Sequence, residues 1–329
     1  MTAGTPEAPT RTRKSAVAVI DGPRSIRFED LPVPRPGPNE VVIRIEGSGI
    51  CGSDVAVWEG REWFDYPFAP GAPGHEGWGV VEEVGVAVTD VAPGCRVAAL
   101  THHAYGSYDV AGSNAVVALP DNVRDPFPAE AVACAMNVFA RSGIGRGSNV
   151  AVVGVGFMGA ILIQLATAAG ARVVALSRRP FSLDVARRCG AQQAISLDAA
   201  DVMGRVAEFT AGELCDVAVE AAGRQTTLDV ASDLVKVRGR LVIAGYHQDS
   251  GRTVNMQSWN WRGIDVVNAH ERDPAIYVEG IRRAVRAVGD GTIDLSPLVT
   301  HSFHLSELDR ALDTLIQRPE GFLKAVVQT

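Results

Sequence analysis

Residues 154–159, with the sequence GVGFMG, join an apolar run at residues 149–153 to an apolar stretch with helical spacing. In a sharp strand-to-helix turn, the first glycine permits the turn, the second lets the backbone approach a ligand, and the third lets helix and strand pack closely. The start of such a helix presents free N–H groups and a positive dipole end, which bind a pyrophosphate. The pattern therefore predicts a dinucleotide site; the alternative is an ordinary strand-to-helix turn. The predicted binding residues are Gly154, Gly156, Phe157, Met158 and Gly159.

The pattern of apolar residues changes along the chain. Residues 149–267 repeat an apolar strand followed by a helical segment, which is typical of a parallel sheet covered on both faces. Residues 15–119 contain short alternating or β-branched runs punctuated by Pro and Gly, as in a barrel-like β domain. We therefore expect an α/β protein with a disordered tail at 1–14, a β-rich catalytic domain at 15–134 and 268–329, and a doubly wound, Rossmann-type domain at 135–267.

The second strand of that domain indicates which dinucleotide binds. An NAD site places an acid at the end of this strand to bind the ribose hydroxyls. Here Ser177 stands at that point, followed by Arg178 and Arg179. A hydroxyl and two guanidinium groups can bind a 2′-phosphate, and no carboxylate repels it. We expect NADP(H) to be preferred, with NAD(H) possible; the alternative is that the two arginines are solvated charges at a helix entry.

Two short motifs in the β-rich part contain metal-ligating side chains. Cys51 lies in GICGSD (residues 49–54), and His75 and Glu76 lie in APGHEGWGVVEEVG (residues 72–85). Thiolate, imidazole and carboxylate groups suit Zn²⁺, and a catalytic zinc site has three protein ligands and one open position. The motifs therefore predict a catalytic zinc site.

Together with the glycine motif, these segments resemble the zinc-containing medium-chain dehydrogenases (alcohol, polyol and threonine dehydrogenases) from about residue 16 to the end of the chain. The resemblance implies a GroES-like catalytic domain, with Cys51 and His75 as zinc ligands and Glu76 ligating the metal or lying beside it. The segment EAVACA, residues 130–135, resembles the EPLACA-type segment of the polyol branch, with Ala131 in place of a proline. The resemblance further implies roles for four residues: Glu130 as third ligand or water-bridged carboxylate, Ser53 as hydrogen-bond partner of the substrate oxygen, Asp54 as the acid that orients a ligand, and Lys324 as a basic residue approaching the cofactor phosphates.

The chain departs from the family pattern in two places. Ala56 stands where many members carry a histidine that passes the proton to solvent, so this proton must leave by the cofactor ribose, water or another side chain. The lobe that holds a structural zinc through four cysteines is absent, and only THHAYGS separates the two flanking strands. We interpret His102 and His103 in that segment as loop residues rather than a second metal site, and expect one zinc per chain.

Charge and composition exclude several classes of partner. The net charge is −7 and no basic patch stands out, which argues against nucleic acid. No apolar run approaches the length of about 18 residues needed for a membrane span, and no signal peptide is apparent, so we expect a cytoplasmic protein. Five irregularly spaced cysteines do not suggest a disulfide framework. We further expect a homo-oligomer, with a dimer as first choice, in which residues 252–256 supply an edge strand.

The resemblance thus implies an oxidoreductase that transfers hydride between NADP(H) and a secondary alcohol or ketone. A polyol, cyclitol or sugar-like compound is the expected small-molecule substrate. One alternative is a metal-free NADPH-dependent quinone or enone reductase of the same superfamily. The other is a non-enzymatic NADPH-binding protein. Cys51, His75 and Glu76 argue against both alternatives, because neither needs a metal ligand set.

Overall fold

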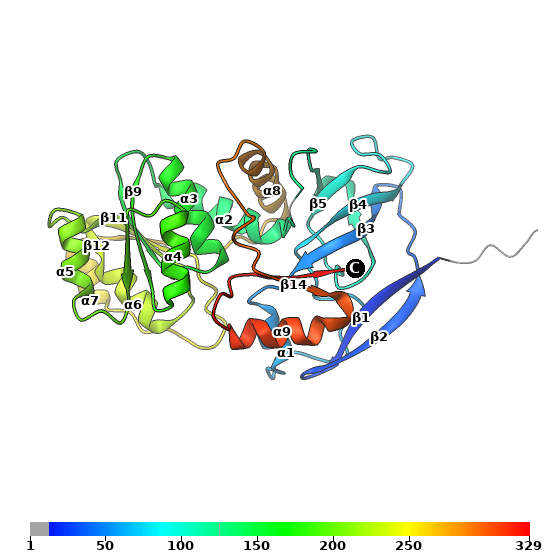
Figure 1. Ribbon diagram of the computed structural model, residues 1–329, viewed down its shortest axis with the longest axis horizontal. Coiled ribbons are helices and arrows are strands. Elements are labelled where there is room, and N and C mark those ends of the chain that lie inside the picture. Colours follow the sequence, from blue (N-terminus) through cyan, green and yellow to red (C-terminus); the bar gives the residue numbers. More distant parts are fainter. Residues whose placement is uncertain (1–12, 125) are drawn as a thin grey trace, which may run out of the picture.

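The computed structural model describes residues 13–124 and 126–329. The tail expected at residues 1–14 lies outside the described residues except at its end, where Lys14 is already the first residue of strand β1. Figure 1 shows a β-rich part and a parallel sheet with its helices lying side by side along the long axis, with helices α2 (Ala129–Ser142) and α8 (Pro274–Gly289) between them. The predicted α/β architecture is confirmed.

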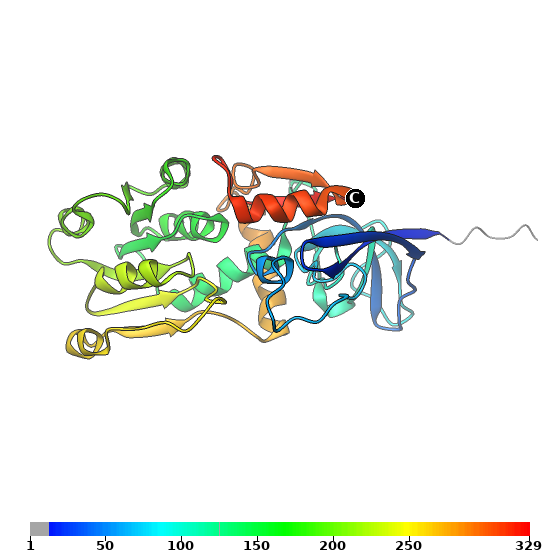
Figure 2. The ribbon, with the colours of Figure 1, turned by 90° about the horizontal axis from the view of Figure 1, so that it is seen from below.

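The β-rich part contains one large sheet and one small one. The large sheet has the order β14-β15-β3-β4-β5-β7, and β6 also pairs with β3. Strands β1 and β2 form a separate antiparallel pair. Helices α1 and α9 pack against each other beside these sheets, and α9 lies on the β-rich part in both views (Figure 1 and Figure 2). The bounds are β1 Lys14–Gly22, β2 Ser25–Pro32, β3 Glu40–Gly49, α1 Asp54–Trp58, β4 Gly77–Val84, β5 Arg96–Ala99, β6 Tyr108–Gly112, η1 Ser113–Ala115, β7 Val116–Ala118, β14 His301–His304, η2 Leu305–Glu307, α9 Leu308–Gln317 and β15 Ala325–Gln328.

The second part is an open sheet of six parallel strands in the order β10-β9-β8-β11-β12-β13. Its central strand is apolar after Asn149: Val150 and Val152 join one core cluster, while Ala151 and Val153 join the other. Successive side chains of a strand point to opposite faces, so both faces of this sheet are covered, as its continuous apolar runs predict. The bounds are β8 Asn149–Val153, α3 Phe157–Ala168, β9 Arg172–Ser177, α4 Pro180–Arg188, β10 Gln193–Ser196, α5 Val202–Phe209, β11 Cys215–Glu220, α6 Gln225–Asp233, β12 Val235–Ile243, α7 Met256–Arg262 and β13 Asp265–Asn268.

The strand order reverses between β8 and β11, which lie next to each other although β9 and β10 intervene in the chain. In open α/β sheets, ligands bind at the carboxyl ends of the strands at such a reversal. The end of the chain returns to the β-rich part, since β15 pairs with β3. Helix α2 runs across the domain boundary that the sequence predicted at residues 134 and 135.

The edge strand expected at residues 252–256 is not a strand. These residues form a loop up to Met256, which begins α7, and the edge of the sheet is β13 instead. The reason is local: the Asn255 side chain accepts a hydrogen bond from Ser258 N at 3.0 Å, which favours the start of a helix over an extended strand. None of the helices among the described residues is both long and apolar enough to cross a membrane.

Candidate metal and dinucleotide site

Strand pairing brings the predicted metal ligands together. Cys51 follows the end of β3, His75 and Glu76 precede β4, and these two strands are antiparallel neighbours with Ser48 opposite Gly77. The ligand atoms of Cys51, His75 and Glu76 all lie within 4.8 Å of one another. Within residues 13–124 and 126–329, this is the one group of three or more Cys, His, Asp or Glu residues with such spacing.

The orientation of His75 suits metal binding. Its Nδ1 lies 2.6 Å from the carbonyl oxygen of Pro73. A carbonyl oxygen only accepts hydrogen bonds, so Nδ1 carries a proton, and Nε2 is the nitrogen left to bind a metal in the neutral form of the ring.

The side chain of Asp54 is hydrogen-bonded to the loop that carries Cys51. The side chain of Asp54 is buried, and its Oδ2 accepts hydrogen bonds from Cys51 N at 2.9 Å and from the Tyr105 hydroxyl at 2.6 Å. The Oδ1 atom lies 4.0 Å from His75 Nδ1. Asp54 therefore contacts the loop of one ligand and faces the ring of another, as expected of an acid that orients ligands. The loop after β5 brings Tyr105 to this acid, a contact that no local sequence motif indicates.

Glu76 is fully buried and paired with Lys324, the residue before β15. Lys324 Nζ donates to Glu76 Oε1 at 2.7 Å and to the Ile50 carbonyl at 3.0 Å. The same nitrogen is 2.5 Å from Glu76 Oε2 but outside hydrogen-bonding geometry, so Oε2 has no donor of its own among the described residues. This oxygen is therefore ion-paired with Lys324 but accepts no hydrogen bond among the described residues, and a carboxylate oxygen retains lone pairs that can ligate a cation.

Acidic groups crowd the site. Burial raises the pKa of Asp54 and of Glu130, and for Glu130 the charge of Glu76 adds to the effect. Burial acts to lower the pKa of His75, but Cys51, Asp54 and Glu130 act in the opposite direction, and its pKa lies well above the usual range. Several negative groups gathered in a buried place favour a bound cation.

Glu130 is not part of the close group. It lies in the first turn of α2, where its Oε1 accepts a hydrogen bond from the Cys134 thiol at 3.0 Å. Burial raises the pKa of Cys134 well above its usual range, and the neighbouring Glu130 carboxylate adds to this effect. Cys134 is therefore a protonated donor that holds the carboxylate. All five cysteines of the chain are free.

The predicted dinucleotide motif occupies the turn from β8 into α3. Gly154 has a φ of 104°, a conformation that side chains rarely adopt. A Cβ on Gly159 would lie 2.2 Å from the Gly154 carbonyl oxygen, so only glycine permits this approach of helix and strand. A Cβ on Gly156 would meet nothing within 4 Å, which leaves its backbone open to a ligand. In the first turn of α3, Phe157 is buried and Met158 is half-buried.

Lys324 lies between the two candidate sites. Its ammonium group, which bonds to Glu76, also lies 5.3 Å from the centre of the Phe157 ring in the glycine motif. The structure thus places this lysine next to the metal ligands as well as next to the start of α3.

The last residue of β9, Ser177, and the two arginines after it differ in exposure and in contacts. The Ser177 side chain is buried, and its Oγ accepts a hydrogen bond from Arg179 N at 3.2 Å. Arg178 is exposed. Arg179 is half-buried and donates to the Phe322 carbonyl at 2.7 Å. Its pKa is lowered, first by burial and then by the charge of Arg318.

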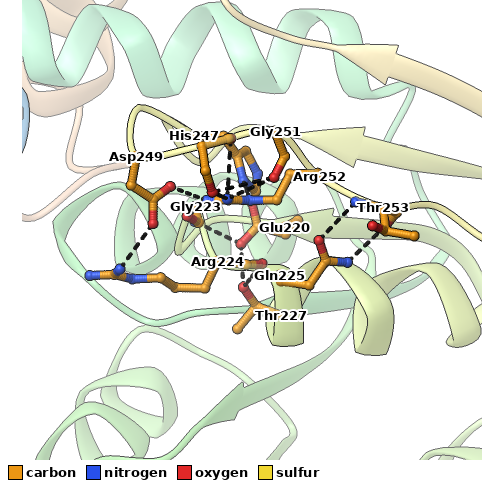
Figure 3. Close-up of polar contacts among 11 residues, drawn as sticks. Glu220, Gly223, Arg224, Gln225, Thr227, His247, Asp249, Gly251, Arg252 and Thr253 are labelled. Carbon is orange, nitrogen blue, oxygen red and sulfur yellow. Dashed lines mark hydrogen bonds and ion pairs between the residues drawn. The ribbon is translucent and has the colours of Figure 1, made fainter.

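The two histidines after β5 form part of a turn. The backbone N–H groups of His102 and His103 donate to Asp109 Oδ2 at 3.1 and 2.9 Å, and His103 Nδ1 lies 3.4 Å from Asp109 Oδ1. They are loop residues tied to one acid. A polar network that the sequence did not predict lies at the ends of β11 and β12, where Glu220, His247 and Arg252 meet (Figure 3). Such contacts between distant segments leave no local sequence motif.

Comparisons with known proteins agree with this geometry. Residues 37–127 match the family described as the alcohol dehydrogenase GroES-like domain, and residues 158–285 match the family described as zinc-binding dehydrogenase. Together the two matches cover more than half of the chain. A sorbitol dehydrogenase of Homo sapiens is 29% identical, over 90% of this chain and 91% of the relative. An L-threonine 3-dehydrogenase of Bacillus velezensis is 27% identical, over 88% and 91%.

Among solved structures, a zinc-binding dehydrogenase of Sinorhizobium meliloti bound to NADP is 25% identical, with a TM-score of 0.84 over 96% of this chain and 99% of that one. An Escherichia coli oxidoreductase of unknown specificity, 23% identical, has a TM-score of 0.86 over 96% and 99% and shows the shared fold. Sequence, site geometry and comparisons agree that this chain belongs to the zinc-type medium-chain dehydrogenase/reductases and is an enzyme of the alcohol dehydrogenase type.

Proposed function

We propose that this enzyme transfers hydride between NADP(H) and a secondary alcohol or its ketone, with one zinc ion per chain. The observation that carries the proposal is the close group of Cys51, His75 and Glu76. A thiolate, an imidazole and a carboxylate are zinc ligands, and three of them leave one position open for substrate. Polyols, cyclitols and sugar-like alcohols are the proposed substrate class, which is supported by relatives named sorbitol dehydrogenase.

Each residue of the site has a proposed role. When bound, zinc supplies Lewis acidity toward the substrate oxygen, and the dinucleotide donates or accepts the hydride. Cys51 and His75 would hold the ion together with Glu76, and Glu130 would either replace Glu76 as the third ligand or bind through water. The Ser53 hydroxyl, which makes no hydrogen bond among the described residues, exchanges a proton with the substrate hydroxyl. Ala56 is buried in α1 and cannot carry that proton further, so the cofactor ribose, water or another side chain must do so.

A metal assay and a substrate panel test this proposal. We expect one zinc per chain by elemental analysis, and turnover of secondary alcohols or polyols with NADP⁺. Replacing Cys51 by Ser should remove most of the zinc and the turnover but leave NADPH binding nearly intact, because the dinucleotide motif lies on a different sheet. Two zincs per chain would reject the proposed count. Zinc-free protein that reduces quinones would favour the metal-free reductase, a reading supported by a mycobacterial quinone oxidoreductase that is 26% identical with a TM-score of 0.79.

The preference for NADP(H) is proposed from the end of β9. Ser177 carries no negative charge, and Arg178 is exposed and available for a 2′-phosphate. The NADP in the Sinorhizobium meliloti structure supports this assignment. A partly exposed charge-assisted contact contributes about 1.5–3 kcal/mol, so the expected preference is about ten-fold to a hundred-fold.

Titration of both reduced cofactors at low salt tests the preference. NADPH should bind more tightly than NADH, and added salt should reduce the difference. Replacing Ser177 by Asp and both arginines by neutral residues should reverse the preference. Equal affinity of the unmodified protein for both cofactors would show that the arginines are only surface charges.

We also propose a homodimer that forms along the edge of the parallel sheet. Strand β13 is the last strand of this sheet, and it pairs only with β12. Large apolar side chains are exposed on and beside this edge: Trp261 is 90% exposed, Met256 52% and Val266 40%. An unpaired strand edge with apolar side chains favours association with a second chain.

A further inference from the structure

A buried carboxylate at the end of β11 organises the polar network of Figure 3. Glu220 is fully buried. Its Oε1 accepts hydrogen bonds from Ala222 N at 2.8 Å, Gly223 N at 2.8 Å and the Thr227 hydroxyl at 2.7 Å. Its Oε2 lies 3.0 Å from His247 Nε2, in the loop that follows β12. This carboxylate therefore joins the loop after β11 to the loop after β12.

Arg252 determines which ring nitrogen of a neutral His247 carries the proton. Its Nε donates to His247 Nδ1 at 2.8 Å, and its guanidinium also donates to the Gly223 carbonyl at 2.9 Å. Because Nδ1 accepts a hydrogen bond, the proton of a neutral imidazole lies on Nε2 and is donated to Glu220. Both ring nitrogens are thus engaged. His247 can hold its loop in place, but in this arrangement it does not relay protons.

The two loops also pack backbone against backbone. A Cβ on Gly245 would lie 2.2 Å from Gly223 N and 2.5 Å from Glu220 Oε2. A Cβ on Gly223, whose φ is 70°, would lie 2.6 Å from the Tyr246 carbonyl oxygen. The glycines allow this contact, and the buried hydrogen bonds fix it, so the loop is held in one position.

The residue after His247 reaches the metal-binding loop. Gln248 Nε2 donates to the Gly52 carbonyl at 2.9 Å, between Cys51 and Ser53. The other donor to that carbonyl, Val55 N, is farther away at 3.4 Å. Gln248 is therefore the closer partner of the Gly52 carbonyl, and this contact joins the parallel-sheet part of the chain to the loop that carries Cys51.

The position of the network indicates its purpose. A dinucleotide binds across the point where the strand order reverses, with one nucleotide on each half of the sheet. The glycine motif and Ser177 lie on the half made by β8, β9 and β10, which takes the adenosine. Glu220 and His247 follow β11 and β12 on the other half, which takes the nicotinamide. Gln248 thus lies where the nicotinamide half meets the metal ligands.

We propose that Glu220, His247 and Arg252 form a positioning network that holds Gln248 against Gly52 and so aligns the nicotinamide half of the site with the metal-binding loop. This inference rests on the proposed function, because it assigns the alignment needed for hydride transfer. His247 and Gln248 are positioning residues: they act through the loop they hold. Small displacements of reacting groups lower rates strongly, whereas binding, which is spread over many contacts, changes little.

Gln248→Ala is the central variant, and Gln257→Ala is its matched control. Gln257 is an exposed glutamine on α7 whose side chain makes no hydrogen bond among the described residues. We expect Gln248→Ala to lower kcat about ten-fold to a hundred-fold while the Kd for NADPH changes less than about two-fold. Amide hydrogen exchange over residues 50–55 should become faster in Gln248→Ala without substrate or cofactor present. Gln257→Ala should leave all three quantities unchanged.

Two variants of the histidine separate positioning from general stability. His247→Gln retains an N–H group that can reach Glu220, and should keep a kcat between those of the wild type and His247→Leu. If His247→Leu does not fold, because Glu220 has lost a donor, Gln248→Ala and His247→Gln decide the question. The proposal is overturned if Gln248→Ala leaves both kcat and exchange at 50–55 unchanged, or if NADPH affinity falls as much as kcat.

Failure of the proposed function and failure of the positioning contact give different experimental results. If the wild-type enzyme turns over no alcohol or ketone, the proposed function is rejected. The exchange measurement then decides the inference alone. Faster exchange at 50–55 in Gln248→Ala supports the positioning contact, and unchanged exchange rejects it.

Discussion

Gly49, at the end of β3, occupies a position in the candidate metal site where a larger residue would overlap its neighbours. Its backbone passes so close to Glu76 that a Cβ would lie 1.8 Å from Glu76 Oε2 and 2.8 Å from Pro128 Cβ. Neither group can move away easily, because Glu76 is fully buried and paired with Lys324. The first glycine of the cysteine motif is therefore required by the carboxylate that faces it.

Replacing Gly49 by Ala should displace Glu76 and weaken metal binding. Loss of a well-positioned group at a metal site typically costs about ten-fold to a hundred-fold in affinity or activity. Zinc retention during dialysis against a chelator and turnover are the measurements. Gly145→Ala is a suitable control, because a Cβ there would meet nothing within 4 Å. Full zinc retention in Gly49→Ala would mean that Glu76 does not help to hold the ion.

His103 provides a pH-dependent prediction away from the metal ligands. The hydrogen bond from His103 to Asp109 is the largest cause of the raised His103 pKa. A raised pKa in the folded state stabilises the fold below the unfolded pKa of about 6.5, and this contribution is lost as pH rises through the folded pKa. Asp109→Asn keeps an acceptor for the backbone N–H groups but removes the charge. The His103 pKa, followed by NMR, should therefore fall toward its ordinary value, and no change would disprove the pairing.

Two glycines in the turn between β8 and α3, Gly154 and Gly156, have different roles. Gly154 has a positive φ, and a Cβ there would lie 2.9 Å from the Ala222 Cβ and 3.0 Å from the Ala221 carbonyl carbon. Gly156 has open space instead. The first glycine serves the fold, and the second leaves room for a ligand.

We therefore expect the two alanine variants to differ. Gly154→Ala should lower the free energy of unfolding by about 1–3 kcal/mol, because the strained backbone and the contact with the loop after β11 both oppose it. Gly156→Ala should leave stability nearly unchanged but weaken NADPH binding, because the new methyl group occupies the approach of the pyrophosphate. Denaturant unfolding and cofactor titration measure both effects. Equal stability loss in the two variants would contradict this division of roles.

At the scale of the molecule, apolar surface is exposed at the edge of the parallel sheet, where β13 has one neighbouring strand among the described residues. Light scattering at micromolar concentration should therefore show a dimer. Val266→Lys places a charge on that edge and should shift the population toward the monomer, whereas Val86→Lys, at a site 98% exposed on the β-rich part, should not. A monomeric wild-type protein would reject the dimer.

Local patterns in the sequence determined most of the fold and the types of ligand. Strand and helix periodicities, the spacing of the glycines, and short motifs around Cys51 and His75 depend on neighbouring residues, so they can be recognised in one segment at a time. The parallel sheet, the position of the glycine turn and the candidate metal ligands Cys51, His75 and Glu76 followed from them. The edge strand did not, because the side chain of Asn255 starts a helix there.

Only the tertiary structure decided which distant groups meet. Lys324 bonds to Glu76 across 248 residues because β15 pairs with β3, beside β4. Gln248 reaches Gly52 because the loop after β12 is held by a buried carboxylate on the neighbouring strand. Glu130 lies outside the close ligand group because of where α2 begins. The physical reason is that strand register, sheet order and helix packing arise from the folded chain as a whole, and a local pattern does not specify which distant side chain lies opposite.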